Sequence, residues 1–509
     1  MRAEFSLIFV VLGLLQLHAS AQLTKEQQKV LEDFEQYMRS NDANERRSQV
    51  EALAFVDGVE ATRLLLEIGL IDDDPRVRHR AAWALSRKED KNAKILMHTD
   101  GLRSKNELIR EGTARAIGKM DDPLDIALQE ALQNERKTAP RIAMLQALAA
   151  HHSIFGTEIA AKLVGDRDLG VVLAAIDMLG AADAEPEHAV LHAALANRDW
   201  RVQAAALEAL GKIRVVESVP VVIDFMANTK GRLLGDARTC LMAITGCQFG
   251  FKAEQWQTWW DRVKDGWEVP DVVITETVEE NDAYGREDTT QTYDRIQTKS
   301  QRMLFILDLS TSMGQSIRFR PRGRRSSAGQ TWRTVERMEL AREELTKYIE
   351  RLDKDTYFNI VIFDAEVDAF KPKLVRATGG SIGEAKKWIG DLKPYDGGPG
   401  NFTKEGYERG ETNVFAALKW IYGFRDQGLD FTGKLKPVAD TVFLLADGAP
   451  TCGELTVTEE ILAQLDRYNH ASRVVIHTIS YDLVGIGRQF LVDVARKTGG
   501  TFVELGNER

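Results

Sequence analysis

Apolar residues in the first half of the chain recur with a helical spacing inside a longer repeat. The clearest copy is anchored at Val77, and further anchors follow at intervals of 29 to 33 residues, at Ile109, Ile142, Val171 and Val202. Residues at offsets of 5, 7 and 8 from each anchor lie near one face of a helix. Residues 23–265 are therefore predicted to form an all-α solenoid with one helical hairpin per repeat. Weaker copies begin near Glu45 and Ala237.

The second half carries uninterrupted apolar runs of strand length. The segment 302–307, apolar from Met303 on, stops at Asp308, and the segment 441–446, apolar from Val442 on, stops at Asp447. Such runs suit strands that are buried on both faces, as in a parallel sheet. Residues 300–509 are therefore predicted to form an α/β domain around a doubly wound, mostly parallel sheet. The chain as a whole is predicted to be multidomain.

Three tryptophans at helical spacing, Trp256, Trp259 and Trp260, close the repeat region. They predict a capping helix that covers the last repeat, with a carbohydrate-stacking platform as the alternative. Residues 266–299 that follow are polar and acid-rich and have no clear periodicity. They are predicted to be a linker that lets the two halves move relative to each other.

Polar side chains gather where the two apolar runs end. Asp308 is followed at alternate positions by the hydroxyls of Ser310 and Ser312, and Thr412 lies just before a helical pattern. Open α/β sheets bind their ligands at the carboxyl ends of the strands. An all-oxygen set suits a hard cation such as Mg²⁺ rather than zinc. The candidate metal ligands are Asp308, Ser310, Ser312, Thr412 and Asp447.

Together these elements resemble the von Willebrand factor type A (VWA) domain and its metal-ion-dependent adhesion site. The resemblance rests on the segments D-L-S-T-S-M, E-T-N-V and A-D-G-A-P-T. It implies that Ser310 and Ser312 ligate the metal, that Thr412 binds directly or through water, and that the two aspartates act mainly through bound waters and as nearby negative charge. It also implies an open coordination position for a partner's Asp or Glu. The ion would be Mg²⁺, or another divalent cation such as Mn²⁺ or Ca²⁺. If the family's strand order holds, the strands that end at Asp308 and Asp447 are neighbours.

The repeats of the first half resemble HEAT-type repeats in their short bacterial form. The Asp-Pro start at Asp74 and the Ala-rich helix faces carry this resemblance. It implies helices that pack on their neighbours and leave a long surface for partners. A solenoid that serves only as a spacer is the alternative.

The composition and the absence of catalytic motifs limit the functions that the sequence predicts. A length of 509 residues with 44% apolar residues predicts several packed domains, and a net charge of −10 argues against nucleic-acid binding. Three cysteines are too few for a disulfide framework, and Cys240 and Cys247 could either pair or stay free. Ser310 and Ser312 have no evident histidine partner, and no nucleophile elbow or phosphate loop occurs in a suitable context. The chain is therefore not predicted to be an enzyme.

Two unusual segments flank the predicted site. Between it and the next expected helix, at about 335–352, lies an arginine-rich stretch with Arg318, Arg320, Arg322, Arg324 and Arg325. These arginines could steer an acidic partner toward the metal, or they could belong to a solvated insertion without a role in binding. A Gly-rich insertion at 395–407 precedes Thr412.

The amino terminus has the layout of a secretory signal peptide. Arg2 precedes an apolar run at 5–17, and Ala19-Ser20-Ala21 matches a cleavage site. Residues 1–21 are therefore predicted to be removed by cleavage after Ala21. No later segment is apolar enough to cross a bilayer. The mature chain is expected to be secreted or periplasmic.

These features together predict an extracytoplasmic adhesion or scaffold protein. Its VWA-like domain would bind an acidic residue of a protein partner through a divalent metal, and its solenoid would supply a second surface. Two alternatives remain: a structural envelope scaffold without metal-dependent binding, and an accessory subunit of an enzyme complex.

Overall fold

A computed structural model describes most of the chain, which divides into two compact units, Met1–Glu187 and His188–Arg509. The boundary between the units falls inside the predicted solenoid. The predicted signal peptide at 1–21 and most of the arginine-rich stretch lie outside the described residues. Those residues are 23–121, 124–271, 291–293, 296–319, 333–395, 401–423, 437–481 and 485–505.

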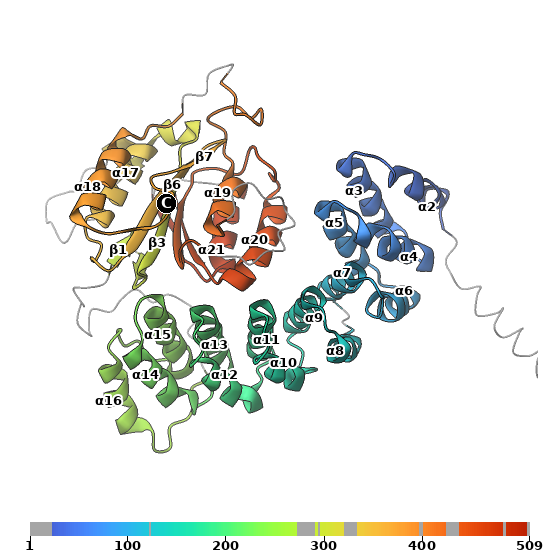
Figure 1. Ribbon diagram of the computed structural model, residues 1–509, viewed down its shortest axis with the longest axis horizontal. Helices are drawn as coiled ribbons and strands as arrows, with labels where there is room; N and C mark the ends of the chain where they lie inside the picture. The colour runs from blue at the N-terminus through green and yellow to red at the C-terminus, as the bar shows by residue number, and fades with distance from the viewer. Residues whose placement is uncertain are drawn as a thin grey trace, which may run out of the picture. The chain divides into compact units, whose positions relative to one another are not determined.

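The first unit is an array of helices in two layers (Figure 1). Helices α3, α5, α7, α9 and α11 pack on one another in sequence, and α4, α8 and α10 pack on the helices that follow them. This arrangement confirms the predicted helical repeats. The bounds are α2 Lys25–Tyr37, α3 Ala43–Ala52, α4 Val59–Glu67, α5 Pro75–Ser86, α6 Lys91–Leu96, α7 Glu107–Ile117, α8 Asp125–Asn134, α9 Thr138–Ala150, α10 Thr157–Leu163 and α11 Leu169–Ala181.

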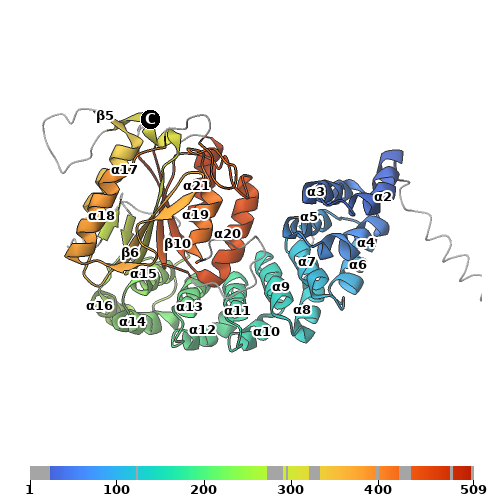
Figure 2. The same cartoon turned by 45° about the horizontal axis from the view of Figure 1, so that its top comes forward.

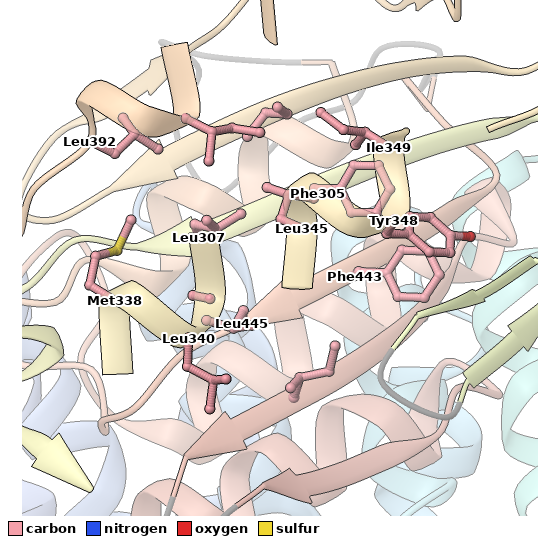
Figure 3. Close-up of a cluster of buried hydrophobic side chains, with 14 of the residues drawn as sticks. Phe305, Leu307, Met338, Leu340, Leu345, Tyr348, Ile349, Leu392, Phe443 and Leu445 are labelled. Carbon is pink, nitrogen blue, oxygen red and sulfur yellow. The ribbon is translucent and has the colours of Figure 1, made fainter. Parts of the chain in front are cut away.

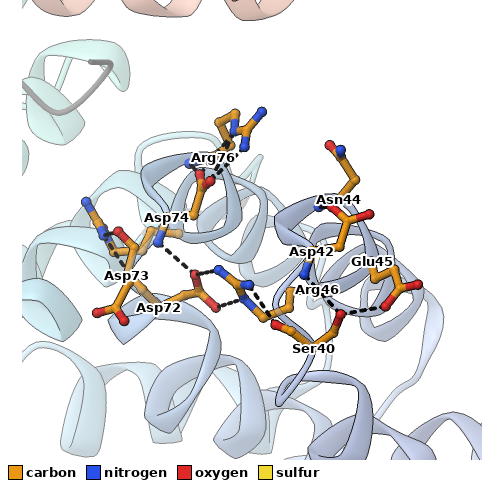
Figure 4. A network of polar contacts seen from close by, with 10 residues as sticks. Ser40, Asp42, Asn44, Glu45, Arg46, Asp72, Asp73, Asp74 and Arg76 are labelled. Atoms are coloured by element: carbon orange, nitrogen blue, oxygen red, sulfur yellow. Dashed lines mark hydrogen bonds and ion pairs between the residues drawn. The ribbon is translucent and has the colours of Figure 1, made fainter. Parts of the chain in front are cut away.

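Polar contacts in the loops join one repeat to the next. The guanidinium of Arg46 in α3 forms a two-pronged ion pair with Asp72, with N–O distances of 2.8 and 2.9 Å (Figure 4). Asp72 also accepts the backbone amide of Asp74, which in turn caps α5 by accepting the amide of Arg76. The pairs Arg110–Glu135 and Arg141–Asp166 repeat this contact in later copies. The polar starts of the repeats therefore fix both the helix ends and the spacing of the copies.

One buried cation predicts a pH dependence of the first unit. Lys88 is fully buried, and its ammonium donates to the backbone oxygens of Leu53 and Val56. Burial lowers the pKa of Lys88 from its ordinary value of 10.5 to about 8, although Asp57 and Asp90 act in the opposite direction. Above the folded pKa, the unfolded chain holds a proton that the folded chain has lost. Stability is therefore expected to rise with pH from about 8 to about 10, by about 2 to 3 kcal/mol.

Urea unfolding of the full chain across this pH range measures the effect. A Lys88→Met variant keeps a side chain of similar length without the titrating group, so its stability should vary much less with pH. Equal pH slopes for the two proteins would contradict the assignment to Lys88.

The second unit begins with five further helices, α12 His188–Ala194, α13 Trp200–Ile213, α14 Ser218–Asn228, α15 Arg232–Thr245 and α16 Ala253–Val263. In α16, Trp256 and Trp260 are buried, and the helix packs on α14. The indole N–H of Trp256 donates to the backbone oxygen of Gly250 at 2.9 Å. This placement matches the capping helix expected from the three tryptophans. Cys240, Cys247 and Cys452 are free thiols, so the first two do not pair.

A mostly parallel sheet is the centre of the rest of the second unit, as the apolar runs predicted. Its strand order is β11-β10-β9-β3-β6-β7, with β8 also paired to β6, and β7 and β8 are antiparallel to β6. Strands β3 and β9 are direct neighbours, which confirms the adjacency expected for the strands that lead to Asp308 and Asp447. The bounds are β3 Arg302–Asp308, β6 Tyr357–Phe363, β7 Val367–Ala369, β8 Val375–Arg376, β9 Thr441–Leu445, β10 Val475–Tyr481 and β11 Phe502–Leu505.

Helices cover both faces of this sheet (Figure 2). Alternate residues of β3 point to opposite sides, so Phe305 and Leu307 pack with α17 Arg337–Ile349 and α18 Gly379–Asp391 (Figure 3). Leu304 and Ile306 pack instead with α19 Val414–Ile421, α20 Thr458–Ser472 and α21 Ile486–Lys497. The central strand is therefore buried on both faces, and its register fixes where Asp308 emerges.

Two short hairpins refine the expected boundaries. Strands β1 Gln291–Tyr293 and β2 Ile296–Thr298 pair within the predicted linker, and the buried side chain of Ile296 joins the core of the sheet domain. Strands β4 Ser316–Phe319 and β5 Arg333–Glu336 frame the arginine-rich stretch. The helix expected to begin near 335 begins instead at Arg337, because Val335 pairs with Ile317 in this hairpin.

Candidate metal centre

Asp308 is the last residue of β3, and its carboxylate is buried at the carboxyl edge of the sheet. One oxygen, Oδ1, accepts the backbone amide of Ser310 at 2.7 Å. The other, Oδ2, is buried and finds no hydrogen-bond partner in the described part of the chain. An unpaired buried carboxylate oxygen is costly for the fold, so this atom is a natural contact for a cation or its water.

The two serines connect Asp308 to the end of the neighbouring strand. The Oγ atoms of Ser310 and Ser312 lie 3.0 Å apart, and Ser312 donates to Oδ1 of Asp447 at 2.7 Å. Asp447 follows β9, the direct neighbour of β3. Four of the five predicted ligands thus form one continuous polar chain across two adjacent strand ends.

Thr412, the fifth predicted ligand, lies on the loop before α19 and is buried. Its amide donates to Oγ1 of Thr451 at 2.8 Å, and its backbone oxygen accepts the amide of Thr451 at 3.0 Å. Its hydroxyl lies 3.9 Å from the position that a Cβ on Gly448 would take. The Thr412 loop is therefore fastened to the loop that follows Asp447, with the hydroxyl beside the backbone of that loop.

The buried carboxylates impose an electrostatic cost on the site. Burial, and then the nearby charge of Asp447, raise the pKa of Asp308 to about 7, although hydrogen bonds from Ser310 act in the opposite direction. A carboxylate with a raised pKa is stabilised in its charged form by an added positive charge. The hydroxyls of Ser310 and Ser312 lie between the two carboxylates, so the site offers only oxygen atoms as ligands. Such a donor set fits a hard cation.

Sequence reasoning missed Arg337, the first residue of α17. Its Nη1 donates to Oδ2 of Asp447 at 2.7 Å, and it lies 3.4 Å from the backbone oxygen of Ser312. The Arg337 guanidinium thus contacts one oxygen of the Asp447 carboxylate, and the Ser312 hydroxyl donates to the other. In the sequence, Arg337 is one arginine at the start of the helical pattern, and five other arginines lie just upstream. Nothing in this local pattern distinguishes it from them.

Sequence reasoning also missed the residues that hold the Thr412 loop from the other side. Oδ2 of Asp364, just after β6, accepts Nε of Arg409 at 2.7 Å and the amide of Gly410 at 3.0 Å. Arg409 also stacks on Tyr395, with its guanidinium carbon 3.9 Å from the ring centre. A cavity of about 230 Å³ lies beside these contacts. It is lined by Leu309, Ile362, Phe363, Asp364, Glu366, Val367, Asp368, Tyr395 and Arg409.

Other candidate chemistry is sparse in the described ranges. They hold no cluster of three or more His, Cys, Asp or Glu side chains that could bind a metal, and the predicted site itself uses only two carboxylates. His188 and His192 have ring centres 5.1 Å apart, and Nε2 of His192 lies 2.8 Å from the hydroxyl of Ser218. No helix in the described residues is long and apolar enough to cross a bilayer.

Comparisons with known proteins support the domain content. Residues 69–149 match the family model for HEAT repeats. The chain is 25% identical over 168 residues to human von Willebrand factor A domain-containing protein 3B, a match that spans 33% of this chain and 10% of that protein. Residues 69–149 are therefore similar to HEAT repeats, and the chain has VWA-like relatives.

Two solved structures are each similar to a part of the chain, at low overall similarity. A von Willebrand factor type A protein from Catenulispora acidiphila is 19% identical with a TM-score of 0.26, over 42% of this chain and 40% of that one. The complex of CpcE and CpcF of phycocyanin lyase from Nostoc sp. is 20% identical with a TM-score of 0.26, over 48% of this chain and 96% of that one.

Proposed function

We propose that the VWA-like domain binds a divalent cation and uses it to recruit an acidic residue of a protein partner. Ser310, Ser312 and Thr412 would offer hydroxyl oxygens, while Asp308 and Asp447 would supply negative charge. The observation that carries this proposal is the buried, unpaired Oδ2 of Asp308 beside a chain of hydroxyls. Mg²⁺ suits the set best, with Mn²⁺ or Ca²⁺ as substitutes.

The bound cation would attract a carboxylate of the partner, which the neutral hydroxyls alone cannot do. The serine and threonine hydroxyls are neutral, and the two aspartates would act mainly through bound waters, so the ion would keep an affinity for an additional negative charge. Ser312 would hold Asp447 in place through its hydrogen bond, and Asp308 would orient the Ser310 backbone. The chain's own residues thus position the acceptor site, and no bond is made or broken. We propose a binding role rather than a catalytic one.

The repeat region would give the protein a second interaction surface. HEAT repeats and VWA-like domains both favour a protein-interaction scaffold, and a solenoid presents a long surface because each repeat packs only on its neighbours. We further propose that the protein acts outside the cytoplasm, as the signal-like segment 1–21 indicates. The mass of the mature chain tests this part, because cleavage after Ala21 removes 21 residues.

Capture of partners from the native envelope tests the metal-dependent role. The full chain is immobilised and exposed to an envelope extract in Mg²⁺ and in EDTA. We expect at least one partner to be retained only in Mg²⁺, and to be lost again when its acidic surface residues are neutralised. Retention of the same partners in Mg²⁺ and in EDTA would favour a scaffold that binds without metal.

A further inference from the structure

We infer that Arg337 sets the metal affinity of this site by competing with the divalent cation for the carboxylate of Asp447. The inference rests on the proposed function, because it assigns a role to Arg337 only if the site binds a cation. Arg337 would be an affinity-determining residue, distinct from the oxygen ligands themselves.

The contact between Arg337 and Asp447 is close and sheltered from water. The side chain of Asp447 is 0% exposed and that of Arg337 is 12% exposed, with 2.7 Å between Nη1 and Oδ2. A charge pair this buried is screened little by salt, so it neutralises much of the Asp447 charge. A divalent ion that binds at the serine hydroxyls must therefore be balanced by an Asp447 carboxylate that is already paired with Arg337.

The guanidinium is nonetheless poorly satisfied where it lies. Arginine has five N–H donors, yet Nε of Arg337 is buried without a hydrogen-bond partner in the described residues. An unsatisfied buried donor is a cost of the position that the guanidinium occupies, and withdrawal of the side chain from Asp447 into water would relieve that cost.

Arg337 can leave without disturbing the helix that carries it. Its backbone amide donates to the oxygen of Gln315 at 3.0 Å, which fixes the start of α17 next to the serine loop. Its side chain is 12% exposed, and we infer that a change of rotamer withdraws the charge from Asp447. The competition therefore requires a side-chain movement and no shift of the main chain.

The charge count gives the direction of the effect. The two carboxylates, Asp308 and Asp447, match a divalent cation, whereas the addition of a nearby guanidinium leaves an excess positive charge. Two cations that share one buried carboxylate repel each other strongly. Removal of the Arg337 charge should therefore tighten Mg²⁺ binding, on the order of tenfold or more.

Mg²⁺ titration of the full chain by calorimetry tests this inference with three variants. Arg337→Gln removes the charge and is expected to bind Mg²⁺ about tenfold more tightly than the wild type. Arg337→Lys keeps the charge and should stay near the wild type. Arg351→Gln removes an exposed arginine just beyond the same helix and serves as the matched control for net charge.

A second measurement follows the wild-type guanidinium directly, and it needs a variant only to assign the signal. The NMR signal of the Arg337 Nε–H group, identified by its loss in Arg337→Lys, should shift as Mg²⁺ is added, because the guanidinium leaves Asp447. A signal that stays unchanged while Mg²⁺ binds would overturn the inference.

The possible outcomes separate this inference from the proposed function. Tighter binding in Arg337→Gln alone supports both. Equal or weaker binding in Arg337→Gln, with clear binding by the wild type, overturns the role of Arg337 and leaves the metal site standing. Mg²⁺ binding by none of the proteins overturns both.

Discussion

Replacement of Asp308 by alanine is expected to abolish the stabilisation that Mg²⁺ gives the wild-type protein. A cation that binds only the folded chain raises its stability, by about 2.7 kcal/mol when its concentration is 100 times the dissociation constant. Asp308 contributes the buried oxygen without a partner, and its other oxygen orients the amide of Ser310. Without this carboxylate, one of the two negative charges of the site is lost, and the Mg²⁺-induced rise in melting temperature should disappear.

In EDTA, the same variant is expected to be about as stable as the wild type, or more stable. Burial and the charge of Asp447 raise the pKa of Asp308, so its ionised form is unfavourable to the fold at neutral pH. Alanine removes that cost and loses the hydrogen bond to Ser310. A variant that melts normally in EDTA but gains nothing from Mg²⁺ has lost the metal and kept the fold.

The matched control is Asp368→Ala, which removes an exposed carboxylate from β7 of the same sheet. Calorimetric scans of the three full-length proteins, each in EDTA and at increasing Mg²⁺, provide the comparison. Asp368→Ala should respond to Mg²⁺ as the wild type does. Equal Mg²⁺ shifts in Asp308→Ala and the wild type would contradict the proposed site.

The strand ends that carry the site could be predicted from the sequence because their signal is local. An apolar run that stops at Asp308, and another that stops at Asp447, are visible without knowledge of any distant contact. In a parallel sheet, such ends share one edge, so the meeting of the two carboxylates near the serines follows from the fold class. The pairing of β3 with β9 confirms this expectation.

The residues that complete the surroundings of the site depend on long-range contacts that no local pattern reveals. Arg337 reaches Asp447, 110 positions away, only because the β4–β5 hairpin returns the chain to the serine loop. Arg409 and Asp364 are 45 residues apart and meet across two loops. In each case one charged residue among many in the sequence acquires a partner through the fold, and its neighbours in sequence give no sign of that partner.

Replacement of Phe305 by alanine is expected to cause the largest loss of stability among the variants considered. Its ring is fully buried in β3, stacked on Phe443 at 5.4 Å and edge-on to Tyr348 at 5.5 Å between ring centres (Figure 3). Loss of a buried phenylalanine leaves a cavity and typically costs about 3 to 5 kcal/mol. For a domain of this size, the melting temperature should fall by roughly 6 to 20 °C.

Phe402→Ala is the matched control, because the same change is made at a side chain that is 54% exposed. Its effect on stability should stay within about 0.5 kcal/mol. Phe305 lies three residues before Asp308, and its ring packs in the hydrophobic core on the α17 and α18 face of the sheet. The serine hydroxyls are held instead by each other and by Asp447. Phe305→Ala should therefore keep the Mg²⁺-induced rise in melting temperature from its lower starting point. A loss of the rise would mean that core packing, and not only the polar chain from Asp308 to Asp447, maintains the geometry of the site.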